Sequence, residues 1–288
     1  MSPQRPAKIQ RALNVFGPFI GLALVIAIFA LIPEVQGRFL RFANFKSVAT
    51  QSVIVALGAL GMTFIIVSGG IDLSAASNIA LSSVIAAYAI NAGAAPLVAV
   101  VLGVLTGGLV GLANGALVTR LRLIPFIVTL GMMGIARGAA KWIAGNQKID
   151  APMTWANELM ARSPRPSWLL LAPGVWIVIL LAVSMAVVLR YTVFGRHVFA
   201  VGSNESAARL CGIRTDRVKI LVYSVAGLFC GLSGGEGSIL GTMVGVMIMS
   251  FLRNGCTMMG WPNYIQEIII GAIIVIAVTL DRLRHRGE

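Results

Sequence analysis

Long runs of apolar residues, separated by short polar intervals, make up most of this chain. Six runs precede residue 190, at about Val15–Ile32, Val48–Val67, Ser74–Ile90, Pro96–Val118, Pro125–Ala144 and Trp168–Leu189. Three more follow a long basic interval, at Ile220–Leu232, Ile239–Leu252 and Ile265–Leu280. A helix of about 20 apolar residues crosses a lipid bilayer. We therefore predict an all-α, polytopic transmembrane helical bundle of about eight to nine apolar segments, forming a single membrane domain over residues 1–288.

The charge balance fits a membrane protein better than a nucleic-acid-binding protein. Only 11% of the residues are charged, yet Lys and Arg outnumber Asp and Glu by 23 to 10. Cytoplasmic loops of membrane proteins carry an excess of Lys and Arg. If the N-terminus lies in the cytoplasm and the spans alternate, the basic interval 190–219 is cytoplasmic as well. We predict a multi-pass protein in contact with membrane lipid, with no nucleic-acid partner.

Residues that could carry a reaction are nearly absent. The sequence has no Gly-x-x-x-x-Gly-Lys-Ser/Thr phosphate-binding loop and no pair of carboxylates within an apolar run. Its two histidines, His197 and His285, both lie in basic intervals. The cysteines, Cys211, Cys230 and Cys256, have neither metal-binding nor disulfide spacing. We predict no catalytic residue, no metal and no cofactor.

The basic interval contains the signals of a short helix. Six of the 23 Lys and Arg lie between Arg190 and Lys219. Ser203 and Asn204 are typical N-cap residues, Glu205 suits a first helical turn, and Gly212 suits a helix stop. Two interpretations remain open from these residues alone: a docking element for a partner, or an ordinary solvated loop.

Asp72 is the acidic residue that stands out between two apolar runs. It follows Gly69-Gly70 and precedes Ser74. A charge at membrane depth is costly and usually faces a cavity or a partner, and irregular backbone is tolerated there only where protein or water covers it. The stretch is therefore either an interruption that lines a pathway or a surface turn in which Asp72 caps the next helix.

Glycine recurs every fourth residue in three stretches. They are Gly103-Gly107-Gly111-Gly115, Gly227-Gly231-Gly235 and Gly237-Gly241-Gly245. Small residues at this spacing let helix backbones approach closely in membranes. The pattern predicts tight helix packing without indicating which helices pair.

Four stretches form a combined pattern. They are Gly61-Met62-Thr63 with Ser68–Ser74; Ile124–Gly131 with Arg137-Gly138; Phe194–Ile213; and Gly234–Ser238 with Gly241-Thr242 and Asn254-Gly255. Together they resemble the permease subunits of bacterial ribose-type sugar ABC importers, over nearly the whole chain. The resemblance implies a permease of the cell inner membrane that moves a monosaccharide such as ribose by alternating access.

The same resemblance implies partners and site residues. A cytoplasmic ATP-binding subunit would hydrolyse ATP, a periplasmic sugar-binding protein would deliver the sugar, and a second permease copy or paralogue would complete the pathway. The implied ATPase-coupling residues are Ser203, Asn204, Glu205, Arg209 and Gly212. The implied substrate-pathway residues are Thr63, Ser68, Gly69, Gly70, Asp72 and Ser74.

One departure from the family pattern bears on the C-terminal third. The family is expected to have several tens of residues, including another span, between the positions of Ser233 and Gly235, where this chain runs on directly. We expect a missing crossing there, with one short run re-entrant or two runs joined at Gly234–Gly237. The alternatives to an active importer are a transport-impaired remnant and a self-contained channel or secondary transporter.

Overall fold

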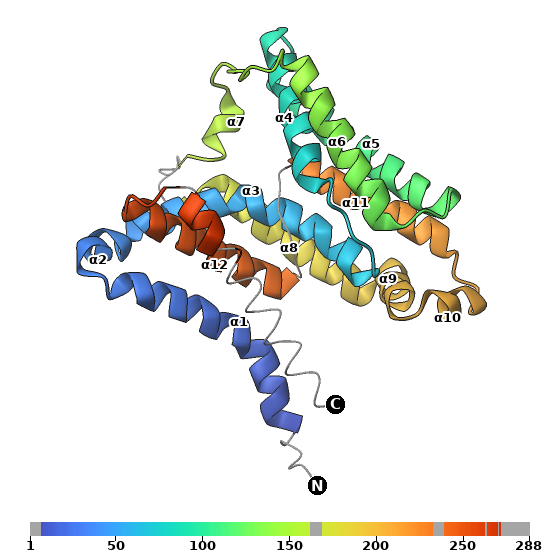
Figure 1. Ribbon diagram of the computed structural model, residues 1–288, viewed down its shortest axis with the longest axis horizontal. Coiled ribbons are helices and arrows are strands. Elements are labelled where there is room, and N and C mark those ends of the chain that lie inside the picture. Colours follow the sequence, from blue (N-terminus) through green and yellow to red (C-terminus); the bar gives the residue numbers. More distant parts are fainter. Residues whose placement is uncertain (1–6, 162–168, 233–238, 263, 270, 272–288) are drawn as a thin grey trace. The chain divides into compact units, whose positions relative to one another are not determined.

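The computed structural model describes residues 7–161, 169–232, 239–262, 264–269 and 271 (Figure 1). Every regular element in this part of the chain is a helix. The helices form two compact units: Met1–Val48 with Met247–Glu288, and Ala49–Val246. The predicted all-α class is confirmed.

The first unit is built from α1 (Ala7–Ala30), α2 (Pro33–Phe39), the start of α3 (Phe42–Val67) and the end of α12 (Ile239–Met258). Its buried core includes Phe29, Phe39 and Phe251, with ring centroids 5.4 Å apart for Phe29 and Phe39. The interval after the first apolar run is helical, and Pro33 opens it because proline is well tolerated in a first turn. The chain bends there by 117°.

The second unit contains the remaining helices. They are the rest of α3, α4 (Ala75–Asn91), α5 (Pro96–Arg120), α6 (Pro125–Ile143), α7 (Trp155–Glu158), α8 (Pro173–Tyr191), α9 (Val193–Ser203), α10 (Glu205–Leu210) and α11 (Thr215–Leu232). Proline opens α5, α6 and α8. Proline lacks the backbone N–H that a first turn leaves unpaired, so these boundaries follow directly from the sequence.

Glycines join α5 to α11 at backbone distance. A Cβ added at Gly107 would collide with the Gly227 carbonyl, and one at Gly231 would lie 2.7 Å from the Cα of Val104. A Cβ at Gly111 would collide with the Tyr223 carbonyl. The predicted close packing is confirmed for two of the three glycine stretches, with the partner helices now identified. The third stretch begins at Gly237, outside the described residues.

The number of spans is lower than the eight to nine expected. Among the described residues, four helices are long and apolar enough to cross a membrane (α3, α5, α6 and α8), or five if the bent pair α1–α2 is one span. Helix α4 has only 17 residues, and α11 opens with the charged residues Asp216, Arg217 and Lys219. Most of the run Ile265–Leu280 lies outside the described residues.

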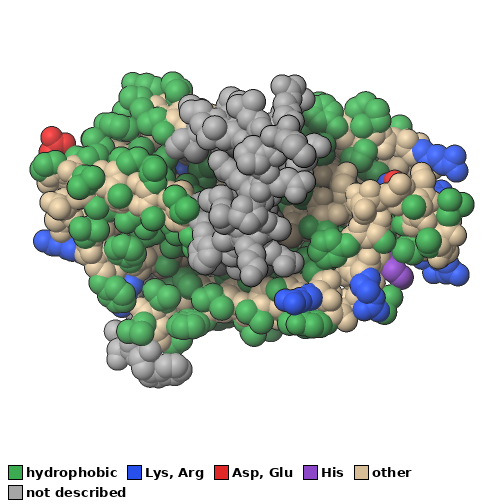
Figure 2. All heavy atoms as spheres, turned by 90° about the horizontal axis from the view of Figure 1, so that it is seen from below, with side chains coloured by type: hydrophobic (Ala, Val, Ile, Leu, Met, Phe, Trp, Pro, Cys, Tyr) green, Lys and Arg blue, Asp and Glu red, His purple; other side chains and the backbone are tan. Residues whose placement is uncertain are grey.

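Apolar side chains cover much of the visible surface, and acidic ones are sparse (Figure 2). Exposed apolar side chains on the spanning helices include Leu97, Leu105, Leu109, Phe126, Ile127, Ile135, Leu180 and Val183. A water-exposed surface of this composition would aggregate, whereas lipid solvates it. The surface therefore supports a membrane location.

The predicted joint between the last two short runs lies at residues 233–238, outside the described residues. The helices on either side of it are longer than the apolar runs, with 18 residues in α11 and 20 in α12. Each helix extends into polar residues, at Thr215–Lys219 and from Arg253 onward. Whether one of them is re-entrant stays a prediction.

Candidate functional site

The basic interval 190–219 is folded as α9, α10 and the start of α11. Thr192 caps α9, because its hydroxyl accepts a hydrogen bond from the Gly195 amide at 3.1 Å. Val198 and Val201 are buried one turn apart and anchor α9 to the unit. Helix α9 was not predicted from the sequence, although Thr192, just before Val193, is a recognisable N-cap signal.

The short helix expected near Ser203–Gly212 is present as α10. Asn204 is its N-cap, and its side-chain oxygen accepts a hydrogen bond from the Ala207 amide at 2.9 Å. Ser203 instead ends α9. Gly212 follows α10 with a φ of +83°, a conformation that favours glycine at a helix stop.

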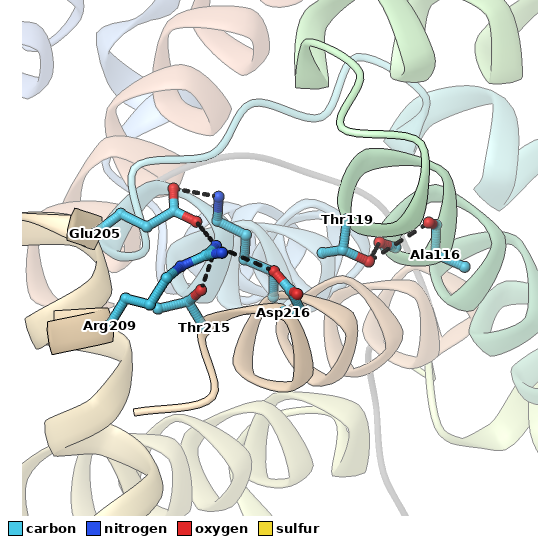
Figure 3. Close-up of polar contacts among 8 residues, drawn as sticks. Ala116, Thr119, Glu205, Arg209, Thr215 and Asp216 are labelled. Atoms are coloured by element: carbon cyan, nitrogen blue, oxygen red, sulfur yellow. Dashed lines mark hydrogen bonds and ion pairs between the residues drawn. The ribbon is translucent and has the colours of Figure 1, made fainter. Parts of the chain in front are cut away.

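A network of charged side chains ties α10 to the first turn of α11 (Figure 3). Arg209 lies between Glu205 of its own helix, at 3.4 Å, and Asp216 of α11, also at 3.4 Å. Its guanidinium also donates to the Thr215 hydroxyl at 2.9 Å. Lys219 binds the other carboxylate oxygen of Glu205 at 2.5 Å. The hydrogen bond from Lys219 lowers the pKa of Glu205 below its ordinary value, so Glu205 is ionised at neutral pH.

The Ser68–Ser74 stretch is an irregular loop between α3 and α4. Gly69 has a φ of +76°, which accounts for glycine there. Asp72 is only 6% exposed and accepts hydrogen bonds from the backbone amide and hydroxyl of Ser74, at 2.7 and 2.6 Å. Asn114 of α5 donates to the same Ser74 hydroxyl at 2.9 Å. The loop is thus held to α5 through side chains buried in the unit.

The other predicted pathway residues differ in their surroundings. The Ser68 hydroxyl donates to the Ile65 carbonyl at 2.8 Å, at the end of α3. Thr63 is buried one turn earlier in α3, where its hydroxyl donates to the Ala59 carbonyl at 3.0 Å. Thr63 is therefore placed in the body of the helix rather than in the loop.

Tyr223 of α11 makes a contact with the Ser68–Ser74 loop that was not predicted from the sequence. Its hydroxyl donates to the Ile71 carbonyl at 3.0 Å, so α11 contacts the loop at Ile71 while Asn114 of α5 contacts it at Ser74. The available signal was a tyrosine within a largely apolar helix, since a buried tyrosine hydroxyl normally has a hydrogen-bond partner.

Two cavities bring the predicted groups together. One, of about 220 Å³, is lined by Ser68, Gly69 and Gly70 together with Ser203, Asn204, Glu205 and Tyr223. The other, of about 370 Å³, is lined by Thr119, Arg122, Glu205, Arg209, Asp216 and Lys219. A Cβ at Gly202 would collide with the Val67 carbonyl, so α9 touches the end of α3 directly.

The cavities thus group three intervals that are distant in sequence: residues 68–70, 118–125 and 201–223. Alternating spans would bring these intervals to the same side of a membrane, and the contacts agree with that arrangement. Four of the predicted site residues line neither cavity: Thr63, Asp72, Ser74 and Gly212. In the described part of the chain, no three His, Cys, Asp or Glu side chains form a group that could hold a metal ion.

Comparison with known proteins places the chain among transport proteins. The sequence pattern of the family described as "Branched-chain amino acid transport system / permease component" matches residues 44–236. The ribose import permease protein RbsC of Bacillus subtilis (strain 168) is 34% identical, with 92% of each chain covered. RbsC of Escherichia coli (strain K12) is 29% identical over 92% of this chain and 93% of its own. The L-arabinose ABC transporter permease protein AraH of Azospirillum brasilense is 32% identical over 92% and 88%.

The lengths of these matches agree with the expected internal gap. The match to the Bacillus protein extends over 303 aligned positions, more than the 288 residues of this chain. The relative therefore carries residues with no counterpart here. The family pattern also ends at residue 236, within the joint where the missing block was expected. No solved structure matches the chain.

The matches confirm the predicted kind of protein and favour neither of the alternatives to an importer permease. Proteins of this kind are the membrane components of ABC importers and are not enzymes themselves, since a partner subunit hydrolyses ATP. The chain belongs to the permease family of ABC importers, and relatives in that family are named as importers of ribose, arabinose and fructose.

Proposed function

We propose that this chain forms half of a pathway for a monosaccharide, ribose or a related sugar, across the cell inner membrane. The names of the relatives support the substrate class, since ribose, arabinose and fructose are small polyhydroxylated sugars. A second copy or a paralogue supplies the other half, and a periplasmic sugar-binding protein delivers the sugar. The N-terminus lies in the cytoplasm, together with the basic interval 190–219.

Helix α10 is the docking element for the cytoplasmic ATP-binding subunit in this proposal. The observation that carries it is the two-sided character of the helix. One side is held by Glu205 and Arg209 to α11, while Leu210 is 89% exposed. Leu210 and Met153 are the most exposed large apolar side chains in the described part of the chain, and Leu210 stands on a capped helix within the basic interval, where a partner surface could cover it.

The Ser68–Ser74 loop is the pathway element in this proposal, together with Thr63 in the part of α3 that precedes the loop. Gly69 and Gly70 line a cavity and leave backbone groups accessible where larger side chains would cover them. Ser74 is fully buried and Ile71 is 50% exposed, so a reporter of pathway accessibility belongs at Ile71.

Co-purification with the ATP-binding subunit tests the docking proposal. The double variant Glu205→Ala/Arg209→Ala removes the ties between α10 and α11, and Leu210→Glu places a charge on the exposed side without touching those ties. Both should reduce the amount of ATPase retained and its sugar-stimulated activity at least tenfold, equivalent to about 1.4 kcal/mol of binding. Membrane insertion should stay normal.

The matched control is Lys148→Ala/Asp150→Ala, which removes another exposed ion pair, between side chains that are 84% and 78% exposed. That pair lies outside the basic interval and should leave co-purification unchanged. Normal ATPase retention in the Leu210→Glu variant would rule out α10 as the docking element.

A further inference from the structure

Tyr223 contacts three elements of the second unit while being only 1% exposed. It belongs to α11, its backbone carbonyl is covered by Gly111 of α5, and its hydroxyl donates to the Ile71 carbonyl of the Ser68–Ser74 loop. A Cβ added at Gly70 would lie 2.9 Å from the Tyr223 hydroxyl. The glycine at position 70 therefore leaves the room in which this hydroxyl reaches the loop.

The same helix receives the charged network from α10. Lys219, one turn before Tyr223, binds Glu205 at 2.5 Å, and Asp216 binds Arg209 at 3.4 Å. A displacement of α10 therefore acts first on the first turn of α11. One turn further along α11, the Tyr223 hydroxyl donates to the Ile71 carbonyl of the loop.

Close packing makes α11 a stiff connection. From Tyr223 to Gly231 its backbone lies against α5. A Cβ at Gly107 or Gly111 would meet backbone atoms of α11, and one at Gly231 would meet backbone atoms of α5. Interlocked backbones have no flexible side-chain atoms with which to absorb a small displacement. A shift at the start of α11 therefore reaches Tyr223 as a movement of the helix.

We propose that Tyr223 is the positioning residue that makes the Ser68–Ser74 loop follow α10 and α11 during transport. This inference rests on the proposed function, in which α10 receives the ATPase and the loop lines the pathway. The physical reason is the burial of Tyr223, which is 1% exposed, whereas Ile71 is 50% exposed. If the two residues separate, the Tyr223 hydroxyl loses its bond to the Ile71 carbonyl, and a buried polar group without a partner is costly.

The experiment uses the complete importer in proteoliposomes, with sugar uptake and ATP hydrolysis measured in the same preparation. Tyr223→Phe removes one oxygen atom and keeps the ring that fills the core. Sugar taken up per ATP hydrolysed should fall about fivefold, the factor that corresponds to about 1 kcal/mol for one hydrogen bond. Sugar-stimulated ATP hydrolysis should stay within about twofold of the wild type.

A merely structural role would lower both activities together, through the amount of folded protein. Tyr88→Phe is the matched control, since Tyr88 is 58% exposed on α4 and should change neither activity. Gly70→Ala is a second variant, because its methyl group would displace the Tyr223 hydroxyl. It should also lower sugar uptake per ATP. The double variant Gly70→Ala/Tyr223→Phe should take up no less sugar per ATP than the more impaired of the two single variants, since both substitutions remove the same contact.

Thiol labelling provides the second measurement. A cysteine at Ile71, in a Cys211→Ser background, should react faster when ATP is turned over than at rest, and Tyr223→Phe should abolish that difference. Unchanged uptake per ATP together with unchanged labelling in Tyr223→Phe would overturn the inference. A wild-type complex without ATP-driven uptake would instead refute the proposed function, and the inference with it.

Discussion

The two ends of α11 are held in opposite ways. At its start, Lys219 and Asp216 bind the side chains of Glu205 and Arg209 on α10, through groups that are 39 to 61% exposed, apart from Lys219 at 22%. From Ile220 onward, the helix lies against α5 with backbone on backbone, at Gly115, Gly111 and Gly107 of α5. The start of α11 is held by flexible charged side chains. The rest of the helix is held by glycines, whose missing side chains let the two backbones touch.

The difference separates an adjustable contact from a rigid one. Ion pairs between exposed groups contribute little stability and can rearrange at small cost. Interlocked helix backbones lose contact energy at once when they separate. In our proposal, α10 therefore adjusts its ion pairs to a partner but stays tied to α11, which moves with α5 as one body.

The largest effect is expected at the rigid contact. Gly111→Ala places a methyl group on the Tyr223 carbonyl, so the two helices must separate. We expect a loss of about 3 kcal/mol of stability, at the upper end for an overpacked core, seen as a lower unfolding temperature in detergent. Gly131→Ala on α6 is the control, because its methyl group would meet nothing within 4 Å. It should be neutral or slightly stabilising, by less than about 1 kcal/mol. Equal unfolding temperatures for the two variants would show that the glycine contact is not what holds α11.

A smaller and more local effect is expected at the adjustable contact. Lys219→Met keeps the length of the side chain and removes its bond to Glu205. Hydrogen exchange should become about fivefold faster at the amides of α10, corresponding to about 1 kcal/mol. The amides of α11 beyond Tyr223 should exchange as in the wild type. Lys148→Met, at a pair that is 84% exposed on the lysine side, should change neither region. Faster exchange along the whole of α11 would mean that its two ends are not independent.

The smallest effect is a pH dependence of the same contact. The bond from Lys219 holds the pKa of Glu205 below its ordinary value of 4.5. The carboxylate's contribution is therefore fully present above that ordinary value and is lost as the pH falls through the lowered pKa. A nitroxide label on Cys211, the exposed cysteine after α10, should keep constant mobility from pH 7 to about pH 4.5 and gain mobility below it. In Glu205→Gln the transition should be absent. Mobility that changes near pH 6 would indicate a different titrating group.

Much of the helical framework could be predicted from local signals. Pro96 and Pro125 mark the starts of α5 and α6, because proline suits the first turn of a helix. Asn204 and Gly212 mark the two ends of α10, because asparagine suits an N-cap and glycine suits the positive φ of a helix stop. Such signals act over a few residues, so a single sequence carries them.

The pairing of elements was harder to predict, because it depends on residues distant in the chain. The glycine spacing predicted a close helix contact, but only the structure identifies α11 as the partner of α5. A tyrosine at position 223 indicated a buried hydrogen bond but not its partner. Its bond to Ile71 joins residues 152 positions apart. Helix α9 was missed because Gly195 and Gly202, which weaken a helix prediction, are used for close approach to α8 and α3.

The central claim is that α10 docks the ATP-binding subunit, and a crosslink from the native Cys211 tests it most directly. Cys211 directly follows α10 and is exposed, whereas Cys230 and Cys256 are buried, so the wild-type chain already presents a thiol at the proposed contact. In the assembled importer, a short thiol-to-amine crosslinker should join this chain to the ATP-binding subunit through Cys211, and Cys211→Ser should abolish the product. An assembled, active importer in which Cys211 yields no such crosslink would contradict the account.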